Sequence, residues 1–483
     1  MKYFKVNKMK YLKIGMISFL SLQMLLQQGI SVNAEIDYNA EAEARKSLTI
    51  QTNEIANWPQ GPCVGAESAI LMEATTGTIL YAKNIDEKLY PASTTKILTC
   101  LIAAEQAEMN EVVTFSNDAV FSIESGSSNM GMDVGEQITM EQALYGVLVG
   151  SANEAANAVA EHIGGSVSSF SEIMNQKAKD LGCKNSNFVN PNGLYSEDHY
   201  TTAYDLATIA RHFFTNDLLC KMSSTSTYEI PPTASQPDDI IIHSKNKLLP
   251  DREYTYDYLV GSKTGFTSEA RQTLVSCAKK DGLTLICVIM KEESPNQFTD
   301  TVSLFDYGFS NFTKMTVSDY ETDYNVSSTD FFQVENNSFG NSSSILNIDE
   351  DAYVVLPNSV TFDEVQSELV YQEDDSDSVA TIQYTYQNIP IGSADVTMSS
   401  PTEPVVEKPL APSITQESEI LPEENILFIN VTKILFIIIG VSGILISIFV
   451  IHSLINNYNF SKSRKIKRKS KPYISSKFEN FDF

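Results

Sequence analysis

Three short clusters of polar residues supply the groups that an acyl-transfer site needs. In chain order they are Ser93-Thr94-Thr95-Lys96, Ser151-Ala152-Asn153 and Lys263-Thr264-Gly265. Together they offer a nucleophilic hydroxyl, an amine that can act as a base and a cationic strand that can bind an anion, without using a histidine. This combination indicates covalent catalysis at a serine.

The first cluster gains its meaning from its context. Ser93 and Lys96 have a spacing that places two side chains on one face of a helix. Two further Ser-x-x-Lys matches begin at Ser244 and Ser276. Ser276 lies in a predicted strand, where this spacing points the side chains to opposite faces, and no apolar helix pattern follows Ser244. Only Ser93, which follows a proline and precedes an apolar run, is predicted to start a buried helix.

The lysine of this cluster needs a special environment. A solvated lysine, with a pKa of about 10.4, is protonated at neutral pH and cannot accept the serine proton. Burial of Lys96 on the inner face of its helix, with Lys263 brought close by the fold, would lower its pKa in two ways. The backbone N–H of Ser93 has no intrahelical partner at a helix start, so it can help to stabilise an oxyanion. An isolated match would usually be an ordinary surface pair.

The second and third clusters supply the remaining groups. Ser151 and Asn153 lie where two predicted helices meet, so that the hydroxyl can relay a proton and the amide can hold a substrate carbonyl. Lys263 and Thr264 offer a charge and a hydroxyl to a carboxylate, and Gly265 permits close backbone approach. Each cluster alone is a common helix cap or turn, whereas the ordered set on one domain indicates an active site.

The surrounding pattern predicts the elements that position these clusters. The predicted elements are strands over 68–73 and 78–83, helices over 139–149 and 153–163, strands between 257 and 290, and a helix over 299–312. Helices that lie between sheet segments along the chain predict a mixed α/β domain.

The cysteines and one hairpin allow a test of strand register. The six cysteines are Cys63, Cys100, Cys183, Cys220, Cys277 and Cys287. A two-residue turn at 281–282 sets Cys277 opposite Ile286 and Cys287 opposite Ser276, so that the two thiols point to opposite faces of the sheet. We interpret the cysteines as small buried apolar residues, with disulfides, which export would permit, as the alternative.

The two ends of the chain predict export and a membrane anchor. Lysines precede an apolar stretch over 14–26, and small residues end at Ala34, as in a secretory signal. Residues 434–455 carry no charge and are numerous enough to span a bilayer, a buried core helix being the alternative. The basic residues over 462–471 predict a cytoplasmic tail. We therefore expect a single-pass protein of the cell membrane with an extracytoplasmic catalytic domain and a short cytoplasmic C-terminal tail.

The composition limits the classes of partner and cofactor, and the segments described above give the domain organisation of the chain. A net charge of −27 makes nucleic acid an unfavourable partner. The histidines show no paired metal spacing, so we expect no metal and no cofactor. The predicted organisation is a signal peptide (1–34), a lead segment (35–57), a catalytic domain (58–312), a β-rich accessory domain (313–400), a Pro-rich linker (401–430), a transmembrane helix (431–455) and a basic cytoplasmic tail (456–483).

With these clusters, the chain resembles a membrane-bound penicillin-binding protein of the serine D-alanyl-D-alanine carboxypeptidase type. Further segments carry the resemblance, namely Ser68–Glu73, Tyr90–Ala92, Asn190–Leu194, His199–Leu206 and Asp306–Phe309. It covers residues 58–312 strongly and 313–400 only by position and composition. The resemblance implies an α/β (α+β) catalytic domain like that of serine β-lactamases and penicillin-binding proteins, in which helices flank an antiparallel sheet. A small β-rich domain and a C-terminal transmembrane helix would follow it.

The resemblance also implies a function, the removal of the terminal D-alanine from peptidoglycan stem pentapeptides. Ser93 would attack the carbonyl that joins the two D-alanines, Lys96 would take its proton, and Ser151 would pass a proton to the departing D-alanine. The backbone N–H groups of Ser93 and Phe266 would form the oxyanion hole. β-Lactam antibiotics, which mimic the substrate terminus, would acylate Ser93 and remain bound as inhibitors.

In the same resemblance Lys263 and Thr264 would bind the terminal carboxylate, beside Gly265. Many relatives carry an assisting arginine where this chain has Gln297, so that another group, such as Arg271, would have to supply the charge. Two other functions stay open. A serine β-lactamase shares the clusters, although the Glu-x-x-Leu-Asn sequence of the class A enzymes is absent between 151 and 263. A non-catalytic wall-binding scaffold would keep the clusters only for shape.

Overall fold

The computed structural model describes residues 37–322, 324, 346–371 and 378–398. The predicted signal peptide, Pro-rich linker, transmembrane helix and cytoplasmic tail lie outside these residues. Within the described ranges no helix combines the length and the apolar character that crossing a membrane requires.

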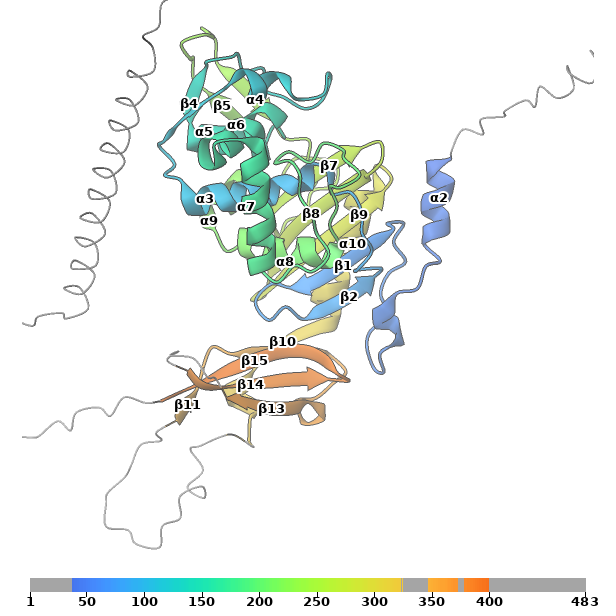
Figure 1. Ribbon diagram of the computed structural model, residues 1–483. Coiled ribbons are helices and arrows are strands. Elements are labelled where there is room, and N and C mark those ends of the chain that lie inside the picture. Colours follow the sequence, from blue (N-terminus) through green and yellow to red (C-terminus); the bar gives the residue numbers. More distant parts are fainter. Residues whose placement is uncertain (1–36, 323, 325–345, 372–377, 399–483) are drawn as a thin grey trace, which may run out of the picture. The chain divides into compact units, whose positions relative to one another are not determined.

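A five-stranded antiparallel sheet forms the centre of the predicted catalytic domain (Figure 1). Its strands, in spatial order, are β2 (Ile79–Lys83), β1 (Ser68–Glu73), β9 (Leu283–Glu292), β8 (Arg271–Lys280) and β7 (Leu259–Thr267). The β8–β9 turn has positive φ at both Asp281 and Gly282, 50° and 82°. Cys277 pairs with Ile286 and Ser276 with Cys287, so the predicted register is confirmed.

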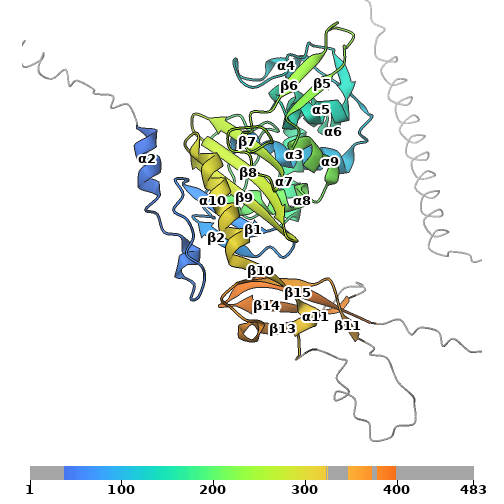
Figure 2. The ribbon, with the colours of Figure 1, turned by 180° about the vertical axis from the view of Figure 1, so that it is seen from behind.

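Helices cover both faces of this sheet. Helix α8 (Ala203–Phe213) packs against β1 and β9 on one face, and α10 (Asn296–Asn311) packs against β8 and β9 on the other (Figure 2). Beyond α8 lies a mainly helical region. Its helices are α3 (Lys96–Gln106), α4 (Asn117–Phe121), α5 (Met140–Leu148), α6 (Asn153–Gly164), α7 (Val167–Asp180) and α9 (Asp217–Ser223). It also contains two short strand pairs, β3 (Val112–Thr114) with β4 (Gln137–Thr139) and β5 (Thr227–Ile230) with β6 (Ile240–His243).

Two local features determine ends of these helices. The side chains of Thr139 and Gln142 form a capping box at the start of α5. Gly165 has a φ of 75° and ends α6 in the left-handed conformation that favours glycine. These caps fix where α5 begins and where α6 ends.

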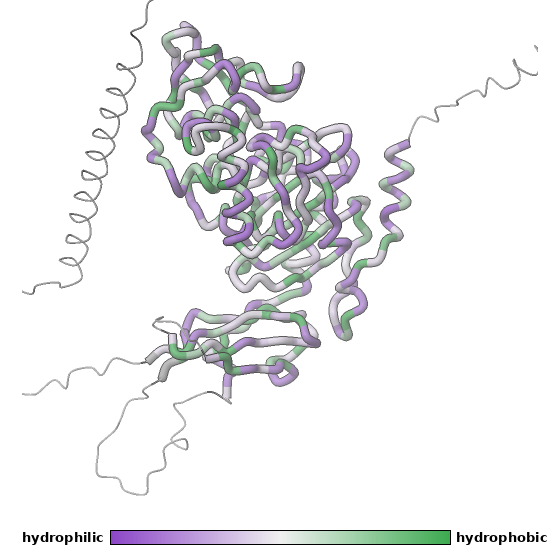
Figure 3. The backbone as a smooth tube through the Cα atoms, in the orientation of Figure 1, coloured by the Kyte–Doolittle hydropathy of each residue, from purple (hydrophilic) through white to green (hydrophobic). Residues whose placement is uncertain are grey.

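The strands separate two hydrophobic cores. Val275 and Cys277 belong to the core beneath the helical region, whereas their neighbour Leu274 and the facing-strand residue Cys287 belong to the core under α10. This division follows from the two-residue repeat of a strand, which points successive side chains to opposite faces. Figure 3 shows the hydrophobic stretches within the sheet and the helices that pack on it. All six cysteines lie in the described ranges and are free thiols there.

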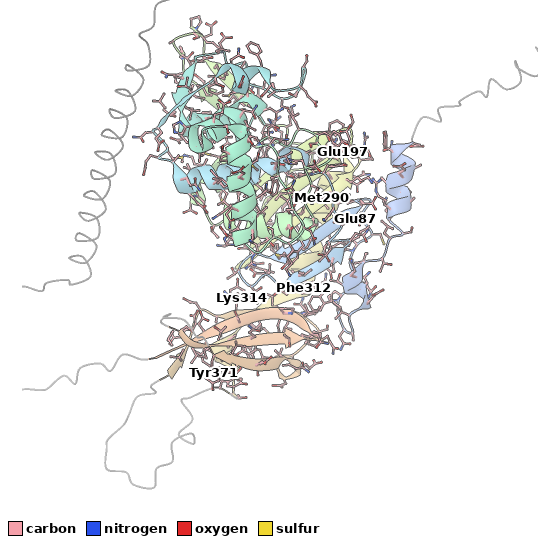
Figure 4. The ribbon with its side chains drawn as sticks, in the orientation of Figure 1. Glu87, Glu197, Met290, Phe312, Lys314 and Tyr371 are labelled. Carbon is pink, nitrogen blue, oxygen red and sulfur yellow. The ribbon has the colours of Figure 1, made fainter. Side chains whose placement is uncertain are left out.

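A second antiparallel sheet follows α10 directly. Its strands are β10 (Phe312–Thr316), β12 (Tyr353–Pro357), β15 (Ile389–Met398), β14 (Ser378–Tyr386) and β13 (Gln366–Tyr371), with β11 (Leu346–Ile348) on β15, and it is accompanied by α11 (Val317–Tyr320) and the short helix η3 (Phe362–Glu364). Figure 4 labels Phe312 and Lys314 in β10 and Tyr371 at the end of β13. The core under α10 continues into this sheet, because the Trp58 ring lies 5.3 Å from that of Phe312 and 6.4 Å from that of Tyr386.

The predicted lead segment is folded onto the catalytic domain. It contains α2 (Tyr38–Arg45) and the short helix η1 (Gln51–Glu54). Arg45 Nε donates to the Gly65 carbonyl at 2.8 Å, and the buried Lys83 donates from Nζ to the Arg45 carbonyl at 2.8 Å. These hydrogen bonds attach the segment together with the buried side chain of Ile50, which belongs to the core under α10.

Candidate active site

Ser93 lies in a tight turn that leads into helix α3. The short helix η2 (Ala92–Thr95) precedes α3, and Ala92 has a φ of 49°. Two hydroxyl groups hold this turn, since Thr94 and Thr273 both donate to the Pro91 carbonyl, at 2.6 and 2.9 Å. Left-handed backbone at a residue other than glycine is strained, and such strain is concentrated at functional sites. Because η2 begins at Ala92 and α3 begins at Lys96, the predicted helix start at Ser93 is confirmed within one turn.

Lys96 is fully buried beside Ser93. Its Nζ lies 2.9 Å from Ser93 Oγ, 2.7 Å from Asn153 Oδ1 and 2.5 Å from the Asn192 carbonyl oxygen. Burial, and then the nearby charge of Lys263, hold the pKa of Lys96 well below its ordinary value. A neutral amine has two N–H groups, which match Asn153 and Asn192, and one lone pair, which matches the Ser93 hydroxyl. The contacts thus fit an amine that accepts the serine proton.

A second pair, Lys263 and Ser151, lies beside the first. Lys263 Nζ donates to Ser151 Oγ at 3.0 Å and to the Thr264 carbonyl at 2.8 Å. Burial lowers the pKa of Lys263 to about 7. Ser151 has a φ of 58°, so the strain seen before Ser93 recurs at this serine. The structure therefore brings together two hydroxyls and two buried amines from three distant segments.

Strand β7 passes close to the backbone of the nucleophile. A Cβ atom at Gly265 would lie 2.9 Å from Ser93 N and 3.1 Å from Ala92 Cβ, so only a glycine leaves room here. Thr264 is half-buried, and the Phe266 side chain is 53% exposed. The approach fits an oxyanion hole at the N–H groups of Ser93 and Phe266, a role that stays a prediction.

Asn153 is held by a loop that the sequence pattern did not identify. Its backbone N–H donates to the Ser128 carbonyl at 2.9 Å. The buried carboxylate of Glu154 accepts from the backbone N–H groups of Met130 at 2.6 Å and Gly131 at 3.2 Å. Burial raises the pKa of Glu154, against the effect of these donors. Glu154 therefore fixes the loop against the start of α6, where Asn153 lies.

His199 is a further support of the site. Its Nδ1 accepts from the Val189 backbone N–H at 3.1 Å, so Nε2 carries the proton and donates to Thr95 Oγ1 at 2.8 Å. The ring thereby ties the segment that offers the Asn192 carbonyl to the turn that holds Ser93. Burial lowers the pKa of His199 to about 4.

We expect acid to weaken the fold through His199. The unfolded side chain binds a proton near pH 6.5, whereas the folded one does so only near pH 4. The stability that the neutral ring contributes is therefore present above pH 6.5 and is lost as the pH falls towards 4, by about 2 kcal/mol between pH 7 and pH 5. Urea unfolding at the two pH values should show a smaller acid loss for His199→Gln than for the wild type. Equal losses would contradict this assignment.

Gly193 lies where no side chain fits. It has a φ of 82°, and a Cβ atom would overlap the carbonyl oxygen of Ala92. Gly193→Ala is expected to lower the free energy of unfolding by about 3 kcal/mol or more, because both the strained backbone and the overlap must be relieved. Gly182→Ala is the control, since Gly182 has a φ of 90° and no heavy atom within 4 Å of its Cβ position. It should cost only about 1–2 kcal/mol in urea titrations. Similar losses for both variants would refute the close contact at Gly193.

The structure does not leave Arg271 free to bind a carboxylate. Its Nε and Nη2 donate to the two carboxylate oxygens of Glu293, at 2.7 and 2.6 Å. Gln297, where an arginine would have assisted, is buried and donates to Gln272 Oε1 at 3.2 Å. The guanidinium is thus already paired with Glu293, and a role of Arg271 in binding the substrate carboxylate stays a prediction.

The competing Ser-x-x-Lys match in β8 has no such geometry. Ser276 is fully buried and Lys279 is exposed, as expected for opposite faces of a strand. The match that begins at Ser244 ends in Lys247, whose Nζ pairs with Glu253 at 2.7 Å on the surface. All three Ser-x-x-Lys matches lie within the described residues. Of these three, only the match at Ser93 has a fully buried lysine within hydrogen-bond distance of its serine.

Comparisons with known proteins agree with this geometry. The family model for D-alanyl-D-alanine carboxypeptidases matches residues 55–294. The D-alanyl-D-alanine carboxypeptidase DacF of Bacillus subtilis is 36% identical over 253 residues, which are 51% of this chain and 63% of that protein. DacB2 of Mycobacterium tuberculosis is 30% identical over 257 residues, 52% of this chain and 84% of that protein. The match thus spans less than two thirds of the length of DacF.

A solved structure extends the comparison beyond the catalytic domain. Penicillin binding protein 5 of Haemophilus influenzae superposes with a TM-score of 0.55 at 27% identity, over 70% of this chain and 98% of that chain. Penicillin binding protein 6B of Escherichia coli superposes with a TM-score of 0.53 at 24% identity, over 71% of this chain. Coverage of about 70% of this chain is more than residues 58–312 alone would give, so the likeness of fold is not limited to the predicted catalytic domain.

Proposed function

The chain belongs to the family of D-alanyl-D-alanine carboxypeptidases, and we propose that it removes the terminal D-alanine from peptidoglycan stem pentapeptides through an acyl-enzyme on Ser93. One observation carries the proposal. The Nζ of Lys96 is completely buried, lies 2.9 Å from Ser93 Oγ and has a pKa lowered well below that of a solvated lysine. Such an amine is a base that can activate a serine at neutral pH.

Acylation follows from these contacts. Ser93 Oγ attacks the carbonyl carbon that joins the two D-alanines, and its proton moves to the lone pair of Lys96. The backbone N–H groups of Ser93 and Phe266 stabilise the oxyanion of the tetrahedral intermediate. The C–N bond then breaks, and Ser151 delivers a proton to the departing amine while Lys263, 3.0 Å away, restores the proton of Ser151. The products are free D-alanine and an ester on Ser93.

Substrate binding uses the groups on β7 and α6. Lys263 and the Thr264 hydroxyl bind the terminal carboxylate, and this anion raises the pKa of Lys263 so that it is charged in the complex. Asn153 accepts from Lys96 through Oδ1, which leaves its NH₂ group to donate to a substrate carbonyl. Before the second half of the reaction Lys96 gives up the proton it took from Ser93, which passes to the neutral Lys263, so that its amine is neutral again. Lys96 then takes a proton from the water that attacks the ester, and it returns this proton to Ser93 Oγ as the shortened peptide leaves.

A synthetic pentapeptide ending in D-Ala-D-Ala tests this function. The wild type is expected to release D-alanine, to leave a peptide ending in L-Ala unchanged and to form a stable covalent adduct with labelled penicillin. Rapid release of hydrolysed penicillin would instead identify a serine β-lactamase. The absence of both D-alanine release and penicillin labelling in the folded protein would identify a non-catalytic scaffold.

The ends of the chain complete the proposal. We place the enzyme outside the cytoplasm after cleavage near Ala34, anchored by residues 431–455, because those segments have the charge and hydropathy pattern of a signal peptide and a membrane span. Protease added to intact spheroplasts should then remove the catalytic domain and leave a membrane-bound C-terminal fragment. Recovery of the whole chain from the soluble fraction would contradict the anchor.

A further inference from the structure

The end of strand β7 has a strand neighbour on one side only among the described strands. β7 is the last strand in the sheet order, and it pairs with β8 alone. At its end Phe266 pairs with Gln272 and Thr267 pairs with Arg271. The backbone of Phe266, which follows the glycine that approaches Ser93, is therefore fixed by the position of the first residues of β8.

Arg271 begins β8 in an unusual conformation. Its φ is 54°, in the left-handed region that favours glycine, so a specific interaction must offset the cost of placing an arginine there. Glu293 provides it through two parallel hydrogen bonds of 2.7 and 2.6 Å. The side chains of Arg271 and Glu293 are only 18% and 7% exposed, so water competes weakly for either group. A bidentate pair of this kind is both strong and directional.

Two aromatic rings flank the same guanidinium. Arg271 Cζ lies 3.8 Å from the centroid of Tyr38 in α2 and 5.6 Å from the centroid of Phe266 in β7. Both distances fall within the range of favourable cation–π contacts. The guanidinium thus joins the residue that follows β9, helix α2 and the residue that follows the third active-site cluster.

We propose that Arg271 is a positioning residue whose pair with Glu293, held under the Tyr38 ring, fixes the end of β7 and so aims the backbone N–H of Phe266 into the oxyanion hole. This inference rests on the proposed function. Because the pair would improve binding of the transition state more than that of the substrate, its loss should lower kcat and leave KM nearly unchanged. A direct carboxylate ligand would have the opposite signature, a raised KM.

Variants of Glu293 distinguish a positioning role of Arg271 from direct binding of the substrate carboxylate by Arg271. If Arg271 positions β7, Glu293→Ala and Arg271→Ala should both lower kcat and the rate of acylation by a fluorescent penicillin by about 10- to 100-fold, because small misplacements of an oxyanion donor have effects of this size. The double variant should be no slower than the slower single variant. If Arg271 instead binds the substrate carboxylate, Glu293→Ala would free it and lower KM, whereas Arg271→Ala would raise KM alone. That result, or wild-type rates in both variants, would overturn the proposal.

Milder variants protect the test against misfolding. Arg271→Lys keeps the charge but not the bidentate fork, and Glu293→Gln keeps the shape but not the charge, so both should fall between the wild type and the alanine variants. Tyr38→Ala should slow acylation by about 2- to 5-fold, whereas Tyr38→Phe, which keeps the ring, should retain the wild-type rate. Wild-type acylation rates in the folded Arg271→Lys, Glu293→Gln and Tyr38→Ala variants would also refute the positioning role.

A neighbouring ion pair gives the matched control. Lys291, near the same end of β9, contacts Glu67 at 3.4 Å, and this pair includes no residue of β7 and not Tyr38. Lys291→Ala should therefore acylate like the wild type. A wild type that neither labels with penicillin nor releases D-alanine would defeat the proposed function, whereas an active wild type with unaffected Arg271 and Glu293 variants would defeat only the present inference.

Discussion

Ser93→Ala is expected to abolish both covalent labelling by penicillin and release of D-alanine. The variant retains the substrate contacts of β7 and the buried amine of Lys96 but has no oxygen to form the ester. Loss of a covalent nucleophile lowers turnover by at least about 10⁴-fold, and the remaining contacts cannot form an acyl-enzyme. Mass spectrometry of the intact protein after incubation with penicillin, together with a D-alanine assay, measures both effects.

The control for this variant is Ser276→Ala. Ser276 is as deeply buried as any residue of the core and begins one of the competing Ser-x-x-Lys matches, but it lies in the middle of β8. Ser276→Ala should label with penicillin like the wild type. If labelling survives in Ser93→Ala, or is lost in Ser276→Ala while the fold is retained, the assignment of the nucleophile to Ser93 is wrong.

Lys96→Arg is expected to lower the acylation rate by about 10³- to 10⁴-fold, although it keeps a cation at this position. Arginine has a pKa above 12 and stays protonated even when buried, so it cannot accept the proton of Ser93. Lys96→Met should be impaired to a similar extent, since it also lacks a base. The agreement of a charged and an uncharged variant would show that the proton acceptor, and not the charge, is what the site requires.

Lys83 provides the comparison for a buried lysine outside the site. Its Nζ donates to the carbonyls of Arg45 and Val64, at 2.8 and 2.7 Å, and burial lowers its pKa to about 8. Lys83→Met is expected to weaken the fold and to leave the acylation rate per folded molecule unchanged. An acylation rate in Lys96→Arg close to that of the wild type would exclude Lys96 as the base.

Much of the site could be predicted because its signals are local. An Asp-Gly turn between two apolar runs fixed the β8–β9 register, and a proline followed by an apolar run located the helix start at Ser93. The proximity of Lys96 to Lys263 needed more than spacing, since the two residues come from a helix and a strand far apart in sequence. The presence of all three clusters in order predicted this proximity, because a single acyl-transfer site requires the groups of all three clusters together.

The supporting contacts could not be predicted, for physical reasons that differ between them. The carbonyl of Asn192 that contacts Lys96 belongs to the backbone, and every residue has one, so the residue type does not predict this contact. The tautomer of His199 depends on a hydrogen bond from Val189 that only the folded chain provides. The pair of Arg271 with Glu293 depends on the register of β8 against β9, in which Gln272 faces Glu292. The packing of α2 depends on hydrogen bonds of Arg45 and Lys83 with backbone carbonyls, which produce no hydrophobic repeat.

The pH dependence of the rate constant for acylation by penicillin tests the central claim most directly. If the Lys96 amine is neutral in the resting enzyme because burial and Lys263 lower its pKa, the rate should already have passed its rising limb at neutral pH. The account therefore predicts a rising limb at a pH far below 10.5 that is absent in Lys96→Arg. A wild-type rate that rises tenfold per pH unit up to pH 10 would contradict it, because the base would then be an ordinary solvated lysine.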